Sequence, residues 1–355
     1  MNKKLMAVAV AGALAIPAVA FAQSSVTLYG TIDTGVRNQS KVQDPTAATG
    51  TTGTLTSVTD GLRTTNRWGM TGSEDLGGGL KANFKLEGQY NSDTGDGPPG
   101  SGSAKGIFGR SSWVGLSSGG ASFDIGKDYT VNFKEVGHYD PMSYSYTGIM
   151  PAVLYTAGVR QGNMITGAFS ANGFEVRADY ALGEVVGSSS AGARFGIGAS
   201  YGAGPITVAG AYSTQKDVAN TGSTKSTTIG GAYRMDAFTF RAGWAQNAYD
   251  AAVSANLDKS RLFMLGVQYA FSDRVSGRVG YYDIKDTGRG ATPADGKKKD
   301  TILAVDYSLS KRTTAYAEID HHAMDGSYNA AGTKIDGSVS FDGTTGVGVG
   351  IAHSF

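Results

Sequence analysis

Apolar and polar side chains alternate, position by position, along most of this chain after residue 25. Residues 80–87 show the pattern without interruption, with Leu, Ala, Phe and Leu at every second position and Lys, Asn, Lys and Glu between them. The alternation recurs in 26–37, 174–180, 238–244 and 347–355. A period of two residues is typical of a β-strand with one apolar and one polar face. The sequence therefore predicts an all-β fold.

The connections between these strands are of two kinds. Seven are tight turns that carry Gly, Asn or Asp, the residues that tolerate positive φ, at 77–79, 119–120, 171–173, 202–205, 235–237, 272–274 and 309–311. Eight are long polar segments, at about 38–65, 92–107, 130–160, 184–192, 217–226, 250–260, 287–299 and 324–342. Together they predict a 16-stranded antiparallel transmembrane β-barrel, in which short turns gather at one end and long loops at the other.

The chain finishes on Phe355, at the end of a strand that alternates to its last residue. An open strand edge invites pairing with another chain, and in lipid it would leave backbone groups without partners. We therefore expect the last strand to pair with the first, with Phe355 as the terminus that seals the barrel. Trp68, Trp113 and Trp244 are expected to face the lipid near strand ends. A soluble β-sandwich also alternates, but its loops would be of similar length at both ends.

The first 22 residues resemble a cleaved export signal rather than part of the fold. Lys3 and Lys4 precede a short apolar run over 5–20, and Ala20-Phe21-Ala22 fits a signal-peptidase site. The predicted organisation is a signal peptide over 1–22 and one barrel domain over 23–355.

Composition excludes several classes of function. The chain has no cysteine, so disulfide scaffolds, thiolate zinc sites and cysteine nucleophiles are excluded. Its net charge of +1 lacks the excess of positive charge that is typical of proteins that bind nucleic acids. His321 and His322 are adjacent, so on a strand they would point to opposite faces and could not chelate one ion. No serine motif accompanies His138, so an outer-membrane hydrolase is disfavoured. We expect no metal, no cofactor and no enzymatic activity.

Several motifs resemble the general bacterial porins, and in particular the β-proteobacterial, neisserial-like Gram-negative porins. They lie at 25–30 (SVTLYG), 66–80 (NRWGMTGSEDLGGGL), 109–116 (GRSSWVGL) and 123–129 (FDIGKDY). The resemblance implies a homotrimer in the outer membrane, surrounded by lipid and lipopolysaccharide. Each subunit would pass ions and small hydrophilic solutes through its own aqueous channel. A basic run at 296–299 falls in a predicted loop, where it indicates a solvated tip or a contact with lipopolysaccharide.

The resemblance also implies that the third long loop, about 130–160, folds inward and narrows the channel. Its many aromatic and apolar residues independently make it a poor solvent loop, so we expect it to pack on the inner wall. A substrate-specific channel or a surface adhesin on the same barrel remain alternative functions.

In this family, arginines of the wall face acids of the inward loop across the narrowest opening. The matching wall positions are Arg67, Arg110 and Arg160, and alternation independently places Arg67 on the face opposite to Trp68 and Met70. The inward face of the third strand adds Lys81 and Lys85 to the predicted constriction. For the opposing acids we expect Glu135, Asp140 and Asp128. Arginines that crowd a narrow opening favour anions.

Overall fold

The computed structural model describes residues 25–43, 51–97, 106–146, 158–290, 294–326, 334–335, 338–339 and 343–355. The predicted signal peptide and residues 147–157 of the predicted inward loop lie outside the described residues. Within the described part, no helix is long and apolar enough to cross a membrane.

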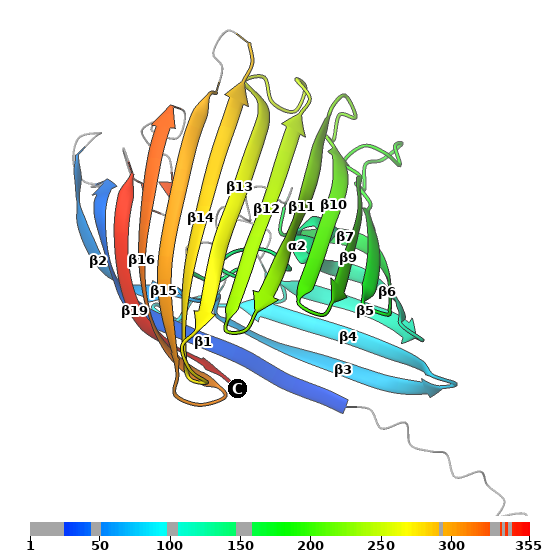
Figure 1. Ribbon diagram of the computed structural model, residues 1–355. Coiled ribbons are helices and arrows are strands. Elements are labelled where there is room, and N and C mark those ends of the chain that lie inside the picture. Colours follow the sequence, from blue (N-terminus) through cyan, green and yellow to red (C-terminus); the bar gives the residue numbers. More distant parts are fainter. Residues whose placement is uncertain are drawn as a thin grey trace, which may run out of the picture.

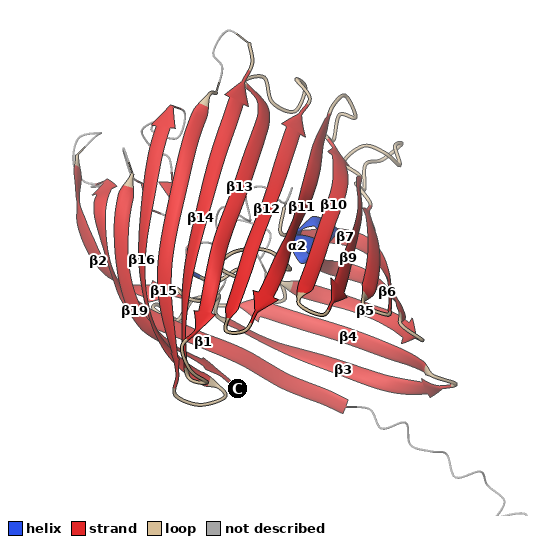
Figure 2. Cartoon of the chain, in the orientation of Figure 1, coloured by secondary structure: helices blue, strands red, loops and turns tan. Residues whose placement is uncertain are grey.

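Strands make up nearly all of the described chain (Figure 2). They are β1 (Ser25–Gln43), β2 (Thr52–Asp60), β3 (Arg67–Gly77), β4 (Leu80–Gln89), β5 (Ser111–Ser118), β6 (Ala121–Tyr129), β7 (Arg160–Ala171), β8 (Phe174–Ala181), β9 (Arg194–Ala203), β10 (Ile206–Lys216), β11 (Ser223–Met235), β12 (Phe238–Tyr249), β13 (Leu257–Ala270), β14 (Val275–Gly288), β15 (Gly296–Ser308), β16 (Thr313–Gly326), β17 (Lys334–Ile335), β18 (Ser338–Val339) and β19 (Thr344–Ser354). The helix α2 (Val131–Val136) lies inside the barrel (Figure 2).

The main sheet closes on itself through its first and last strands (Figure 1). β1 pairs with β19 from Thr31↔Ser354 to Gln39↔Gly346. β1 also pairs with β3 through its first residues and with β2 through its last, so β2 and β3 are two halves of one wall strand. The described residues therefore form a closed antiparallel barrel of 16 wall strands, which confirms the predicted fold class.

The two faces of the wall have the chemistry that alternation predicts. On β1, the outward side chains of Val26, Leu28, Ile32 and Val36 are between 42% and 64% exposed. Arg37, on the other face, is buried in the interior and donates to Glu318 of β16. An apolar exterior around a polar interior suits a barrel that stands in lipid.

All seven predicted short turns join consecutive strands in the described chain. The C-terminus lies at the same end of the barrel as these turns (Figure 1). This end is called the short-turn end below, and the opposite end is the long-loop end.

Two sequence-based assignments of loops are wrong. The predicted loop 38–65 is largely strand, since β1 runs to Gln43 and β2 covers Thr52–Asp60. Among the described residues of this segment, 61–66 separate β2 from β3, and Leu62 from this break is buried in the interior. The basic run 296–299 is the start of β15, so Lys298 points inward and is buried while Lys297 and Lys299 point outward.

The predicted lipid contact of Trp113 is also wrong. Its neighbours Val114 and Leu116 are 61% and 45% exposed on the outer face, so alternation along β5 points the Trp113 ring inward. On β5 the side chains that face outward are aliphatic, so the position of a single tryptophan does not indicate which face of the strand meets the lipid.

Candidate functional site

The segment 130–146 enters the barrel and lies along its inner wall (Figure 2). The Thr130 hydroxyl caps α2 by accepting from the backbone N–H of Phe133 at 3.3 Å. The backbone N–H of Val131 donates to a carboxylate oxygen of Asp179 on β8, 2.7 Å away. Helix α2 then contacts β9, β10 and β11. The predicted packing of this apolar segment on the wall is confirmed for its described residues.

Glycines in the wall make room for the segment after α2. A Cβ at Gly230 of β11 would lie 2.3 Å from the Tyr139 ring, and one at Gly243 of β12 would lie 2.4 Å from the same ring. On β13, a Cβ at Gly266 would come within 2.6 Å of Pro141. The missing side chains let the loop lie directly on the backbone of three neighbouring strands. The inner wall is therefore shaped to accommodate this segment of the loop.

Polar contacts hold the far end of the segment. Asp140 accepts from the backbone N–H of Tyr144 at 2.7 Å and from the hydroxyl of Tyr282 on β14 at 2.9 Å. The hydroxyl of Tyr146 donates to Asp306 of β15 at 2.6 Å. Its backbone N–H donates to the carbonyl of Arg63, in the break between β2 and β3, at 3.0 Å. The segment 130–146 thus runs along the inner wall and is held by hydrogen bonds at both of its ends.

A second group of side chains gathers on the wall around Tyr129. Arg110 donates through Nε to Glu87 at 2.6 Å and through Nη2 to the Tyr129 hydroxyl at 2.8 Å. Arg160 donates to the same hydroxyl at 2.7 Å, and its guanidinium carbon lies 4.3 Å from the centre of the Tyr129 ring. Lys85 places its Nζ 3.4 Å from Glu87. We call these side chains, together with Arg67, the arginine cluster.

Arg67 joins the cluster through strand register. It lies directly opposite Gln89 of β4, whose side-chain oxygen accepts from Nη1 of Arg110 at 3.3 Å. Lys81 lies elsewhere, at the short-turn end of β4, where it lines a cavity with Glu175 and Arg177. Of the predicted basic residues, the structure therefore brings together Arg67, Arg110, Arg160 and Lys85, and it leaves Lys81 apart.

The predicted acids lie between the loop and the wall. The side chain of Glu135 has no exposed surface, and its carboxylate oxygens lie 3.5 Å from Arg177 Nε and 3.8 Å from His138 Nε2. Burial raises the pKa of Glu135 to about 7. Burial likewise raises the pKa of Asp140, which is fully buried, to about 6. An acid enclosed in this way gives up hydration and favours its neutral form.

Asp128, at the root of the loop, has a different setting. It accepts from the Ser111 hydroxyl at 2.8 Å and pairs with Nζ of Lys134 at 2.9 Å. It thereby joins β6 to helix α2, and its side chain is 18% exposed.

Sequence reasoning missed several residues of the interior. Arg63 reaches Asp306 at 2.6 Å, but its sequence position had been assigned to an external loop. Arg177 alternates visibly with outward Val176, so its inward direction was predictable, whereas its contact with the loop was not. Nothing local marks Tyr129 as the shared acceptor of two arginines, because that role depends on strands far apart in sequence.

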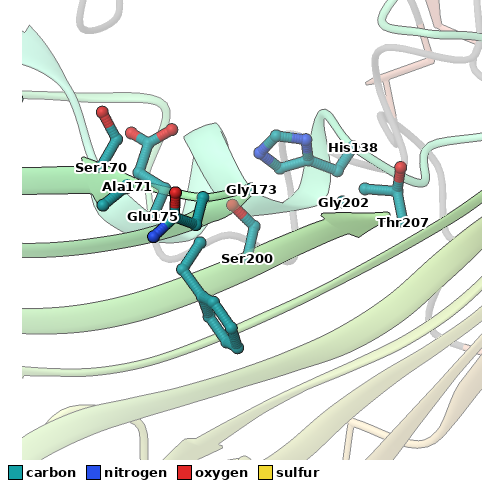
Figure 3. Close-up of a pocket in the computed structure, with 10 residues that line it drawn as sticks. His138, Ser170, Ala171, Gly173, Glu175, Ser200, Gly202 and Thr207 are labelled. Carbon is teal, nitrogen blue, oxygen red and sulfur yellow. The ribbon is translucent and has the colours of Figure 1, made fainter. Parts of the chain in front are cut away.

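A cavity of about 550 Å³ lies beneath the loop at the short-turn end (Figure 3). His138 of the loop, Glu175 of β8, Ser200 of β9 and Thr207 of β10 line it. Residues 170–174 and Gly202, in and beside two of the short turns, complete its lining. Among the described residues, no group of three or more His, Asp or Glu side chains could hold a metal ion.

Comparison with known proteins agrees with this architecture. A family model described as Gram-negative porin matches residues 7–327. The outer membrane porin protein 32 of Delftia acidovorans is 30% identical over 379 residues, with 100% of both chains covered. The major outer membrane protein P.IB of Neisseria meningitidis serogroup A is 27% identical over 375 residues, again with 100% of both covered.

Among solved structures, the anion-selective porin from Comamonas acidovorans superposes with a TM-score of 0.76 at 26% identity. The match covers 94% of this chain and 100% of that one. A closed barrel, an inward loop, an apolar exterior and this likeness along the full length lead to one assignment: the chain belongs to the Gram-negative porin family and forms a diffusion channel in the outer membrane.

Proposed function

We propose that this channel passes small hydrophilic solutes and ions and favours anions, because the arginine cluster sets the charge of its narrowest part. The observation that carries the proposal is a charge imbalance. Among the described residues of the cluster, Arg110 and Lys85 contact the Glu87 carboxylate, Arg160 shares the Tyr129 hydroxyl with Arg110, and Arg67 lies opposite Gln89. Glu87 is the one carboxylate in this set of contacts. A ring of charged side chains at a constriction sets ionic preference. The anion selectivity of the Comamonas porin supports this direction.

The acids of the loop have another role in this proposal. Glu135 and Asp140 are enclosed between loop and wall, so they face no solute, and Asp140 holds the loop through the Tyr282 hydroxyl. Asp128 ties the root of the loop through Lys134. With Glu135 and Asp140 out of contact with the passing solution, the positive charge of the cluster is left less balanced. Lys81 adds positive charge near the mouth at the short-turn end.

The test is the reversal potential of single channels in a salt gradient. Replacing Arg67 and Arg160 together by alanine removes two positive charges, so the reversal potential is expected to move towards that of a cation-preferring channel. The matched control is Lys216→Ala with Lys225→Ala, which removes two exposed charges from the outer face. An unchanged reversal potential in the Arg67 and Arg160 variant would reject the charge filter.

The same recordings separate the alternative functions. A general diffusion channel conducts in proportion to solute concentration, whereas a substrate-specific channel saturates and is blocked by its solute. An adhesin would bind through the long loops without altering either behaviour. No chemical step is part of the proposal, since the relatives are channels rather than enzymes.

We also propose that the chain assembles as a homotrimer, in contact with outer-membrane lipid and lipopolysaccharide. Residues 1–22 would serve as the export signal and 23–355 as the barrel domain. Insertion of one assembly into a planar bilayer should then raise the conductance in three equal steps as the subunits open. Single isolated steps of one size would contradict the trimer.

A further inference from the structure

Three basic side chains lie directly opposite one another on the outer face of neighbouring strands. Arg261 of β13 faces Lys285 of β14, and Lys285 faces Lys297 of β15. All three residues are exposed. Their side of the wall is the lipid side, because Phe263 and Leu303, which share their phase on β13 and β15, are 49% and 47% exposed. We call these three residues the basic row.

The basic row is unfavourable for the barrel taken alone. Residues directly opposite in an antiparallel pair have Cβ atoms about 4.5–5.5 Å apart, and like charges at such positions repel. Directly opposite partners for these charges lie at the two ends of the row, and Asp283 lies two positions from Lys285 on the same face of β14. Nε of Arg261 donates to Gln246 of β12 at 2.9 Å, and Lys297 lies opposite Asp325 of β16. Lys285, in the middle, has a cation on each side.

The position of the row along the barrel points to its partner. It lies near the long-loop ends of its strands, whereas towards the short-turn end the outward residues become Phe263, Tyr281 and Leu303. This is the border between an apolar belt and the headgroup region of a membrane. A further outward lysine, Lys299, lies opposite Asp283 one step closer to the belt.

We propose that the basic row binds the phosphate groups of lipopolysaccharide in the outer leaflet. The proposal rests on the outer-membrane placement described above, with the long loops outside. Phosphate oxygens accept strong charge-assisted hydrogen bonds from guanidinium and ammonium groups, and an anion seated across the row would cancel its internal repulsion. A row of cations at the border of the apolar belt is complementary in charge to the anionic headgroups of a lipid, and such a headgroup is the occupant we propose.

The first test counts bound lipid. Lys285→Gln with Lys297→Gln removes two charges of the row, and Lys216→Gln with Lys225→Gln removes two exposed outward charges from β10 and β11. Both variants and the parent would be purified from outer membranes in mild detergent, and lipopolysaccharide per barrel would be measured by mass spectrometry. We expect at least a threefold loss for the row variant and no loss for the control. Equal retention in all three proteins overturns the proposal.

The second test uses the melting temperature, because the proposed role predicts the direction in which it changes with and without lipopolysaccharide. In lipid-free detergent at low salt, the row variant should melt at or above the parent, since repulsion has been removed. Added lipopolysaccharide should raise the melting temperature of the parent more than that of the variant, and dephosphorylated glycolipid should not discriminate between them. If the variant instead loses its oligomeric state without lipid, a second copy covers the row and the proposal fails. The reversal potential should be unchanged in this variant, so these results stand apart from the charge filter.

Discussion

At the scale of single residues, the enclosed acids of the inward loop make its attachment sensitive to pH. Burial raises the pKa of Glu135 from 4.5 to about 7. A carboxyl whose pKa is higher in the docked state favours docking fully below its ordinary pKa, and this contribution is lost as the pH rises through the higher value. The loop is therefore expected to be held more firmly at pH 5 than at pH 8.

Replacing Glu135 by glutamine should remove most of this pH dependence and strengthen docking at pH 8 by about 3 kcal/mol, because the pKa rises from 4.5 to about 7 and each pH unit of that rise corresponds to about 1.4 kcal/mol. Hydrogen exchange of the α2 amides, corrected for the intrinsic effect of pH, measures the change. Asp273→Asn, in a short turn, serves as control. If the parent shows equal protection at pH 5 and pH 8, the enclosed carboxyl does not control the loop.

The directions of wall side chains could be predicted from the sequence, but the contacts of the loop could not. Alternation placed Arg67 inward, and the family resemblance supplied Arg110 and Arg160. The burial of Glu135 depends on which face of a six-residue helix meets β9, where the Val131 and Glu135 side chains lie over Gly198. No periodicity within so short a segment specifies that choice, so the contacts of Glu135 could not be predicted from the sequence.

At the scale of elements, the wall and the inward loop are shaped for each other. Gly243→Ala would place a methyl group where the Tyr139 ring now lies, at 2.4 Å. Overpacking of this kind costs typically 1–3 kcal/mol, so we expect the loop to be displaced towards the channel axis while the barrel remains closed. Single-channel conductance should fall. Gly167→Ala on β7 is the matched control, because a Cβ there meets no atom within 4 Å. Equal conductance in the Gly243→Ala and Gly167→Ala variants would show that the close contact between β12 and Tyr139 does not position the loop.

The break between β2 and β3 could not be predicted from the sequence. Its residues are as rich in Thr and Gly as the true loops, so composition predicted one long loop from 38 to 65. What turns 61–66 inward is tertiary: a Cβ at Gly348 of β19 would lie 2.3 Å from Leu62, and Arg63 bonds to Asp306 of β15. Both partners are more than 240 positions away in sequence.

At the scale of the whole molecule, everything depends on closure between the two ends of the chain. Closure could be predicted because alternation runs to the last residue and lipid does not tolerate an open edge. The structure adds the join itself, in which the backbone of Phe355 donates to the Gly30 carbonyl at 3.1 Å and accepts from the Gly30 N–H at 3.2 Å.

Deleting Phe355 should therefore reduce the yield of folded barrel, because it removes both of these backbone bonds and leaves Gly30 unpaired at the seam. Phe355→Ala keeps the backbone and removes only the ring, so it separates the two contributions. The folded fraction is measured by the difference in gel mobility between unheated and heated samples. We expect the deletion to lower it strongly and the alanine variant to lower it less. If both fold like the parent, the seam is held by β1 and β19 from Thr31↔Ser354 onward, and the last residue is dispensable for sealing the barrel.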